Sequence, residues 1–315
     1  MKRLFISAGK FFTLFLCLGV ALNAAEPSAK NNFNVRDYGA VGDGKNLDSP
    51  AIDRAINAAA AAGGGPVLLP AGTYLSGSIH LKSNIRLLID AGATILGAPQ
   101  SMNAYDETEP FPSGAYQDGG HCYFHNSLIW GENLTNVFIT GHGMINGGGL
   151  DRNPKILDEM CGYTHFGTPN TNEFKPVRIG NKSIALKLCR NVVISDITIF
   201  HGGHFAILVT GCDNLTIDNV TIDTNRDGMD IDCCRNTIVS NCRVNSPVTR
   251  IAKCPPGKIV MSLMTTFRQS LSAMDLLPMR TGGKSFVLGV PKWVKPHISS
   301  RILGLCSNPP PLIMP

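Results

Sequence analysis

Several motifs that would point directly to a function are missing from this sequence. Its ten cysteines form no Cys-x-x-Cys pair, so a zinc knuckle is not expected. The glycine run at 63–65 follows a predicted helix instead of opening one, so it does not indicate a phosphate-binding loop. After residue 25 no apolar run is long enough to span a bilayer. These absences argue against a nucleotide-binding site and a membrane-spanning segment in the mature chain.

Acidic residues are scarce in one part of the chain only. Residues 248–315 contain one Asp or Glu against nine Lys and Arg, whereas residues 1–247 contain 22 against 19. The net charge of +5 therefore comes from the tail. It gives no indication that the body of the protein binds nucleic acid, and we expect no nucleic-acid partner.

The N-terminus has the pattern of a cleaved secretion signal, which we predict over residues 1–25. Lys2 and Arg3 precede an apolar run at 11–20, and small alanines follow that run. The run is too short to cross a bilayer comfortably. We therefore expect the mature protein to be secreted or periplasmic, without a membrane partner.

A repeat between residues 189 and 244 organises the chain. Cys-Arg-Asn-Val-Val-Ile at 189–194 returns as Cys-Asp-Asn-Leu-Thr-Ile at 212–217 and as Cys-Arg-Asn-Thr-Ile-Val at 234–239. Each copy carries short alternating apolar runs, which are typical of strands. Units of about 20–25 residues made only of short strands cannot bury their own apolar face, so successive copies must stack. The repeat predicts a parallel β-helix in which stacked Asn amides hydrogen-bond to each other.

The cysteines are predicted to play two parts. Cys189, Cys212 and Cys234 recur at repeat positions, which favours buried, small, apolar side chains there. Nine cysteines remain after signal cleavage, and an odd number leaves at least one free thiol. Cys122 and Cys161 flank a loop-like stretch and could pair.

Before the repeat, the chain predicts a capped start and two loops. Ser49 is the expected N-cap of a helix over 49–62, with Pro50 at its first position. Its apolar face would cover the N-terminal end of the solenoid, and its members are Ile52, Ala55, Ile56 and Ala59. The stretches 98–127 and 150–176 lack alternation, so we expect loops that could form substrate-binding walls.

Two kinds of motif carry a resemblance to a known family. The segments 37–44 and 70–74, with the helix between them, resemble the start of many right-handed β-helix proteins. More specific are Gly-His-Gly-Met-Ile-Asn-Gly-Gly-Gly at 141–149 and Asn-Arg-Asp-Gly-Met-Asp at 225–230. The latter is similar to the Asn-Thr-Asp-Gly-x-Asp motif of glycoside hydrolase family 28, the polygalacturonase family. The resemblance implies an all-β, right-handed parallel β-helix with an N-terminal capping α-helix.

The resemblance also implies a reaction, the inverting hydrolysis of α-1,4-linked galacturonate or a related pectic sugar. Inversion requires two carboxyl groups roughly 6.5–9.5 Å apart on opposite sides of the scissile bond. Asp227 matches the first catalytic Asp of the family, with Gly228 expected to allow the turn that presents it. Asn225, Asp230 and His204 are the expected substrate contacts.

Strand alternation adds an orientation to these residues. Met229 and Ile231 share a parity and should point inward, which leaves Asp230 and Asp232 pointing outward. For these two acids a solvated face and a substrate-facing role both remain open.

The chain departs from the family after this motif. The family carries an Asp-Asp pair about 20 residues after Asp227, but the chain reads Pro-Val-Thr-Arg at 247–250 and contains no Asp-Asp at all. The later Gly-His-Gly and Arg-Ile-Lys motifs are missing too, since Gly141-His142-Gly143 lies upstream on an earlier coil. We therefore predict an incomplete β-helix domain at 26–247, a disordered or non-native, frame-shifted tail at 248–315, and impaired catalysis.

Two other functions share this fold. A calcium-dependent pectate lyase could use four acids as oxygen ligands, namely Asp223, Asp227, Asp230 and Asp232. A non-catalytic carbohydrate-binding β-helix would fit the missing acid pair. For the histidine pairs, a loop role near the cleft is favoured over metal binding, and the pairs are His201 with His204 and His121 with His125. We expect a monomer that binds a pectic oligo- or polysaccharide and needs neither metal nor cofactor.

Overall fold

The computed structural model describes residues 32–110, 120–153 and 175–246. It also describes the backbone of three short strands at 248–251, 259–261 and 266–268. The predicted signal at 1–25 lies outside the described residues and stays a prediction. Within the described part of the chain, no helix is both long and apolar enough to cross a membrane.

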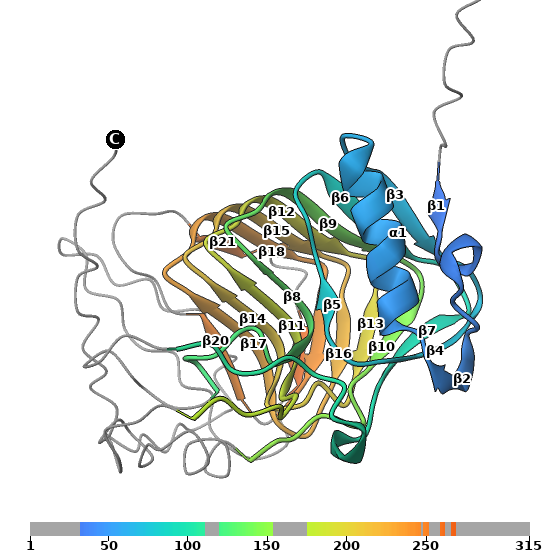
Figure 1. The fold of residues 1–315 in the computed structure, drawn as a ribbon. Coiled ribbons are helices and arrows are strands. Elements are labelled where there is room, and N and C mark those ends of the chain that lie inside the picture. The colour runs from blue at the N-terminus through green and yellow to red at the C-terminus, as the bar shows by residue number, and fades with distance from the viewer. Residues whose placement is uncertain are drawn as a thin grey trace, which may run out of the picture. The chain divides into compact units, whose positions relative to one another are not determined.

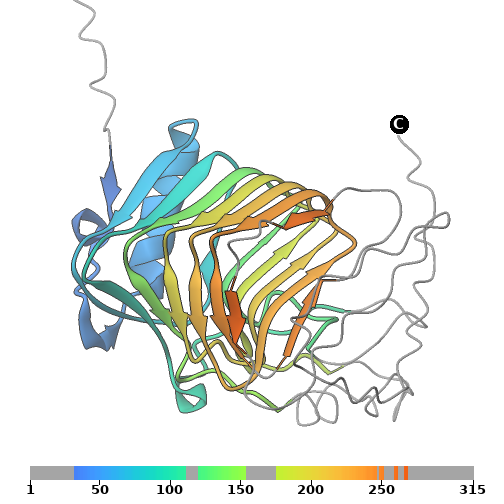
Figure 2. The same cartoon turned by 180° about the vertical axis from the view of Figure 1, so that it is seen from behind.

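The strands form three parallel sheets, which we call A, B and C (Figure 1). From β3 onward, successive strands pass from sheet A to B to C and then return to A, so each coil contributes one strand to each sheet. This connectivity confirms the predicted all-β, right-handed parallel β-helix with an N-terminal α-helix. Figure 2 shows the successive coils lying side by side when seen from behind.

The strand bounds follow the sheets. Sheet A contains β1 (Phe33–Asn34), β3 (Gly65–Leu69), β6 (Ile85–Ile89), β9 (Thr135–Gly141), β12 (Arg190–Ser195), β15 (Asp213–Asp218), β18 (Arg235–Ser240) and β21 (Ile259–Met261). Sheet B contains β2 (Asp43–Leu47), β4 (Gly72–Ser76), β7 (Ala93–Gly97), β10 (Met144–Asn146), β13 (Thr198–Phe200), β16 (Thr221–Asp223), β19 (Arg243–Asn245) and β22 (Thr266–Arg268). Sheet C contains β5 (Ile79–His80), β8 (Ser127–Glu132), β11 (Lys182–Lys187), β14 (Phe205–Thr210), β17 (Asp227–Asp232) and β20 (Val248–Ile251).

The core consists of aliphatic columns that run through the coils. Parallel pairing without a register shift places like residues above one another in sheet A, and one fully buried column is Leu87, Ile139, Ile194, Ile217 and Val239. Because strand side chains alternate between two faces, each strand gives only every second residue to such columns. The alternation seen in the sequence is therefore the pattern of a solenoid interior.

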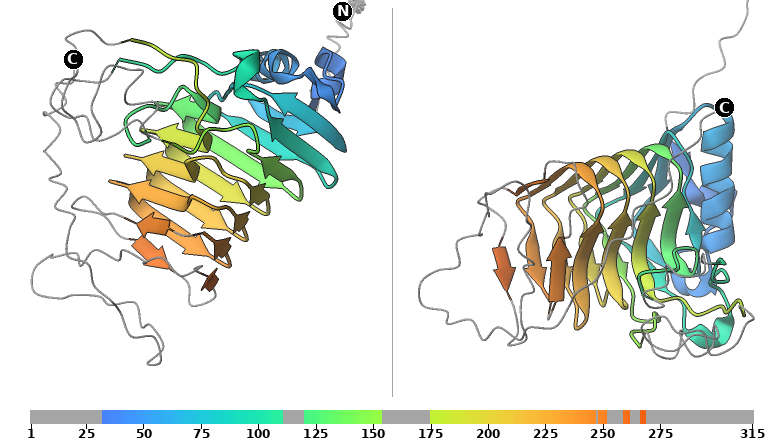
Figure 3. Two further views of the ribbon diagram at one scale, coloured as in Figure 1. Left: turned by 90° about the horizontal axis from the view of Figure 1, so that it is seen from below. Right: turned by 90° about the vertical axis from the view of Figure 1, so that its left-hand side faces the viewer.

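Helix α1 (Ser49–Ala61) covers the N-terminal end of this core, beside β1, β3 and β5 (Figure 3, right). Its predicted apolar face is buried in the core. The predicted N-cap, Ser49, is wrong by one residue, because Asp48 occupies that position and makes no side-chain cap hydrogen bond. The Asp48 carboxylate instead accepts hydrogen bonds from the backbone N–H groups of Val41 and Gly42, at 2.7 and 3.0 Å. Two short 3₁₀ helices complete the helical elements of the described residues, η1 (Val35–Tyr38) and η2 (Gln100–Met102).

The predicted asparagine ladder is present and longer than the repeat indicated. Asn136 donates to Asn84, Asn191 to Asn136 and Asn214 to Asn191, each through Nδ2 to Oδ1 at 2.7–2.9 Å. All four have φ between 55° and 63°, the left-handed region that Asn tolerates better than most residues. Asn236 keeps this backbone conformation but donates to Asp213 instead. The ladder therefore ties together the turns of successive coils.

The repeated cysteines are buried, as predicted. Cys189, Cys212 and Cys234 are at most 1 % exposed and belong to the core cluster. Cys122 is buried as well, and its pairing with Cys161 stays a prediction. Cys161 itself lies outside the described residues.

The two predicted loops and the predicted tail have different outcomes. In the described parts of 98–127 and 150–176 the one strand residue is Ser127, the first of β8, in agreement with loops that project from the coils. After residue 247, β20, β21 and β22 each pair with the last strand of one sheet, so strand backbone continues where we expected none. The boundary at 247 and the nature of the tail remain predictions.

Candidate functional site

The outer face of sheet C carries the family motif. Met229 and Ile231 of β17 belong to the core cluster, so Asp230 points to the opposite, outer face, as alternation predicted. Asp227 has the same parity as Met229, but it is in register with Phe205, which packs with Leu208 in the outer-face cluster and not in the core. Asp227 and Asp230 therefore lie on one outer face of the solenoid.

This outer face changes in chemical character from coil to coil. One column runs across five strands in register and consists of His80, Trp130, Ala185, Leu208 and Asp230. Phe124, Ala185, Phe205 and Leu208 form an apolar cluster in the middle, with Trp130 packed against it. The acids of β17 lie beyond this cluster. The four apolar side chains are at most 2 % exposed, so other parts of the chain cover the middle of this face.

Asp227 lies between a guanidinium and an imidazole. It is 4 % exposed, and its Oδ1 is 3.4 Å from Nη1 of Arg226. The other terminal nitrogen of Arg226 is 3.4 Å from Nε2 of His204, a side chain that is itself buried. The backbone N–H of Asp227 donates to the carbonyl of His204 at 3.1 Å. The structure thus brings Asp227 and His204 together, with Arg226 bridging them.

Two expectations about this motif need adjustment. Gly228 lies inside β17 and not in a turn, so the strand itself presents the Asp227 side chain. Asn225 is exposed just before β17, next to Arg226 in the chain. Its role as a substrate contact stays a prediction, as do those of Asp230 and His204.

A second group of polar atoms lies on the same face. Ligand atoms of His121, Asp230 and Asp232 all fall within 4.8 Å of one another. His121 comes from the loop before β8, and its Nε2 is 3.0 Å from Oδ2 of Asp230. Asp230 is 2 % exposed. The sequence around Asp230 does not predict that His121 is its partner, because the two residues are 109 positions apart.

The four acids that the sequence offered as calcium ligands do not come together in one group. Asp223 ends β16 in sheet B, where its Oδ1 accepts a hydrogen bond from Asn245. Among the described residues, only Asp230 and Asp232 of the four acids join a group that could hold a metal ion. That group contains an imidazole, a ligand that calcium does not favour.

The remaining histidines of the two sequence pairs have separate surroundings. The ring of His201 packs on Phe200, with centroids 3.7 Å apart. The ring of His125 stacks on Trp130 at 4.0 Å, and its Nε2 is 3.3 Å from Glu132. Neither belongs to a group of three possible metal ligands in the part of the chain that the structure covers.

The coil after β17 has no acid at the two positions beside the motif. In backbone register, Val248 follows Asp227 and Arg250 follows Asp230. Adjacent coils lie about 4.8 Å apart, so this is where a stacked carboxylate partner would stand. The acid pair that the sequence lacks is thus replaced on sheet C by Val248 and Arg250.

A family model for rhamnogalacturonase A/epimerase, pectate lyase-like proteins matches residues 32–254. This chain belongs to that family. The match covers the strands from β1 to β20, and it confirms the resemblance to a polygalacturonase-like β-helix of glycoside hydrolase family 28.

Three similar proteins show the range of functions found among proteins that resemble this chain. A Vitis vinifera protein described as a probable polygalacturonase is 29 % identical over 242 residues, which are 72 % of this chain and 46 % of the relative. The plasmin and fibronectin-binding protein A of Streptococcus pneumoniae is 35 % identical over 190 residues, 59 % of this chain and 23 % of the relative. The chain thus spans less than half the length of either. The hyperthermoactive exopolygalacturonase of Thermotoga maritima has a TM-score of 0.54 at 25 % identity, over 70 % of this chain and 55 % of that structure.

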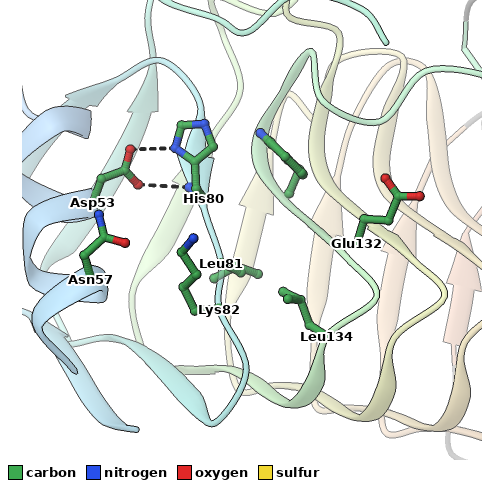
Figure 4. A pocket seen from close by; sticks show the side chains of 8 residues that line it. Asp53, Asn57, His80, Leu81, Lys82, Glu132 and Leu134 are labelled. Atoms are coloured by element: carbon green, nitrogen blue, oxygen red, sulfur yellow. Dashed lines mark hydrogen bonds and ion pairs between the residues drawn. The ribbon is translucent and has the colours of Figure 1, made fainter. Parts of the chain in front are cut away.

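This member of the pectate lyase-like family has a further polar cluster at the other end of sheet C. His80 Nδ1 lies 2.6 Å from Asp53 Oδ2, and His80 Nε2 lies 2.6 Å from Asp106 Oδ2. Trp130 Nε1 donates to the same oxygen of Asp106 at 2.8 Å. Figure 4 shows Asp53, on α1, facing the ring and the backbone nitrogen of His80.

A pocket of about 310 Å³ opens beside this cluster, and Asp53, Asn57, His80, Leu81, Lys82, Trp130, Glu132 and Leu134 line it. It lies against α1, β5 and β8, whereas Asp227 lies on β17. The pocket is therefore three or four strands away from the family motif. We place the candidate chemistry at Asp227 because that residue belongs to the motif that carries the resemblance to the family.

Charge explains why the His80 cluster is held together. Hydrogen bonding to Asp106 and to Asp53 raises the pKa of His80 to about 10, although burial acts in the opposite direction. Burial would raise the pKa of Asp106, but the hydrogen bonds from His80 and Trp130 outweigh it and lower that pKa. His80 is therefore an imidazolium between two carboxylates at neutral pH. Sequence reasoning missed this cluster because its members lie on a helix, a strand and a loop with no shared local pattern.

This raised pKa predicts a pH-dependent stability. His80 contributes most below its ordinary pKa of 6.5, and the contribution falls as the pH rises through about 10, because the folded state must then lose the proton. We expect His80→Gln to lower the unfolding temperature at pH 6 and to lower it much less at pH 10.5. The measurement is thermal unfolding of both proteins across this range.

The exposed His142 provides the control for this prediction. The His142→Gln variant should differ from wild type by the same small amount at every pH. If the loss of unfolding temperature in His80→Gln is equally independent of pH, the ion-paired state of His80 is contradicted.

Proposed function

We propose that this chain is a glycoside hydrolase of polygalacturonase type that acts on pectic polysaccharide by inverting hydrolysis. Membership of the family and the likeness to the polygalacturonases support this proposal. Asp227 is the proposed catalytic carboxyl residue, and Asn225, Asp230 and His204 are the proposed substrate contacts. The observation that carries the proposal is the position of Asp227, which lies on an outer face beside Arg226 and His204.

We further propose that catalysis is impaired in this chain. Inverting hydrolysis needs a second carboxyl group, held across the scissile bond from the first. The positions that follow Asp227 and Asp230 in the next coil are Val248 and Arg250, and neither can donate or accept the proton as a carboxyl group does. The remaining groups can bind and orient a saccharide, but the second proton transfer has no identified carrier.

Release of reducing ends from polygalacturonate tests both parts of the proposal. We expect the purified chain to release no more than its Asp227→Asn variant. Translating the gene in each other reading frame after codon 247 should reveal an Asp-Asp pair and further coils. The chain extended in that frame should be at least about 10²-fold more active, because one positioned acid or base supplies about 10²–10⁴ in rate.

The Asp227→Asn change in the extended chain separates the possible outcomes. It should remove the gained activity, whereas Asp223→Asn, on a different sheet, should leave it unchanged. Activity that persists without Asp227 would contradict its catalytic role. If neither frame restores an acid pair, the frame-shift hypothesis is wrong.

A carbohydrate-binding protein without hydrolytic activity is the second candidate. The missing acids favour it, and one relative is a binding protein by name. Retention of pectic fragments on the immobilised chain, without cleavage, would support it. Binding that stays equal after Trp130→Ala and Asp230→Asn would argue against this face as the binding surface.

The place of action follows from the N-terminal pattern. We propose that the protein is secreted or periplasmic and acts as a monomer outside the cytoplasm. Signal cleavage after export, read as the N-terminus of the protein recovered from medium or periplasm, tests this directly. An intact Met1 on exported protein would contradict cleavage near residue 25.

A further inference from the structure

Three side chains on the outer face of sheet C converge from two parts of the chain. Asp230 and Asp232 lie two residues apart on β17 and therefore share a face. His121 reaches them from the segment before β8, and the three ligand atoms lie within 4.8 Å of one another. One strand and one loop are thus joined through an imidazole and two carboxylates.

A second observation concerns the Asp230 carboxylate, one oxygen of which lacks a hydrogen-bond partner. It is 2 % exposed, its Oδ2 contacts His121, and its Oδ1 is buried without a hydrogen-bond partner. Burying a carboxylate oxygen without a partner is costly, and the cost is removed when a cation coordinates it. The buried oxygen therefore points to a bound cation.

Two basic side chains described on this face pair with acids outside the group. Arg226 pairs with Asp227, and Lys187 lies 3.0 Å from Glu132 at the neighbouring position of the outer face. His121 contributes at most one positive charge to two acids. The three side chains by themselves thus carry at most one positive charge and up to two negative charges, which suits a divalent cation.

The donor set selects the kind of ion. Calcium and magnesium prefer cages of oxygen atoms, whereas an imidazole with two carboxylates suits zinc or manganese. Tetrahedral zinc holds N and O ligands at about 2.0–2.2 Å, so its ligand atoms lie roughly 3.3–3.5 Å apart. The 3.0 Å separation of His121 and Asp230 is close to that value, and small side-chain rotations would draw in the widest pair.

We propose that His121, Asp230 and Asp232 bind a divalent transition-metal ion of the zinc or manganese type. The ion joins the loop segment that carries His121 to β17, and it leaves coordination positions for water. It is proposed as a structural clip, and the hydrolysis proposed above needs no metal. Asp230 is also a proposed substrate contact, so metal binding is tested below without a saccharide.

Titration of the purified full-length chain with zinc chloride, after chelator treatment, tests the proposal. Calorimetry should show one high-affinity ion per chain, and excess calcium should not displace it. The visible absorption of cobalt added in place of zinc should report a nitrogen ligand. Zinc should also raise the unfolding temperature, since a ligand that binds only the folded state stabilises it.

Matched variants assign the binding to these residues. We expect His121→Ala and Asp232→Asn each to weaken zinc binding at least tenfold, while His125→Gln and Asp223→Asn leave it unchanged. Because Asp230→Asn keeps the shape of the buried side chain, circular dichroism can confirm that it folds before its loss of binding is measured. No saccharide is present, so failure of the hydrolase proposal does not affect the result. Absence of zinc binding, or equal binding by wild type and His121→Ala, would overturn the site.

Discussion

Replacing Gly141 by alanine is expected to destabilise the β-helix by at least about 3 kcal/mol or to prevent folding. Gly141 has φ of 123°, a region that a residue with a side chain adopts only at considerable cost. A Cβ there would overlap the carbonyl oxygen of Ile89 and lie 2.8 Å from its carbon. Both atoms belong to the backbone of the preceding coil, which cannot move aside without breaking the pairing of β6 and β9. Urea unfolding of wild type and variant measures the difference.

Gly148 provides the control from the same glycine-rich segment. It is exposed, and the nearest atoms to an added Cβ belong to the side chains of Asn146 and His201, at 3.2 and 3.9 Å. We expect Gly148→Ala to change the stability by less than about 1 kcal/mol. If both variants behave alike, close stacking of coils is not the reason for Gly141.

Replacing Asn191 by alanine is expected to cost about 2–5 kcal/mol. The change removes the donor to Asn136 and the acceptor for Asn214, both at 2.9 Å, and each lost hydrogen bond costs about 0.5–1.5 kcal/mol. It also places alanine at φ of 55°, which adds roughly 1–2 kcal/mol. The free energy of unfolding in urea gives the total.

Two further variants separate the contribution of the hydrogen bonds from that of the backbone conformation. Asn191→Gly keeps the left-handed backbone available but removes the amide, so it should lose less stability than Asn191→Ala. Asn103→Ala has a similar φ of 48° outside the ladder and should show the backbone contribution alone. Equal losses for Asn191→Ala and Asn103→Ala would mean that the ladder hydrogen bonds contribute nothing.

Local signals in the sequence predicted the solenoid. The recurrence of Asn191, Asn214 and Asn236 reflects a turn that every coil repeats, and the alternation around Ile194 reflects an inside and an outside. Both are properties of a few neighbouring residues. The cap of α1 was misplaced because the Asp48 side chain bonds to the backbone at Val41, a contact made by folding and invisible to helix rules.

The candidate site could be predicted only where it depends on neighbouring residues in the sequence. The orientation of Asp230 followed from strand parity, and Asp227 followed from a motif. His121 could not be placed, because a loop of irregular sequence brings it to β17. His80 with Asp53 and Asp106 was likewise beyond local reasoning, since the fold alone assembles the three.

The column from Trp130 to Asp230 makes the outer face of sheet C unsymmetrical along its length. Its two ends are three strand spacings apart, about 14 Å at roughly 4.8 Å each. Trp130 at one end is partly exposed, whereas Ala185, Leu208 and Asp230 are at most 2 % exposed. The column is therefore accessible to solvent at its aromatic end and covered at its carboxylate end, so the two ends differ in accessibility as well as in chemistry.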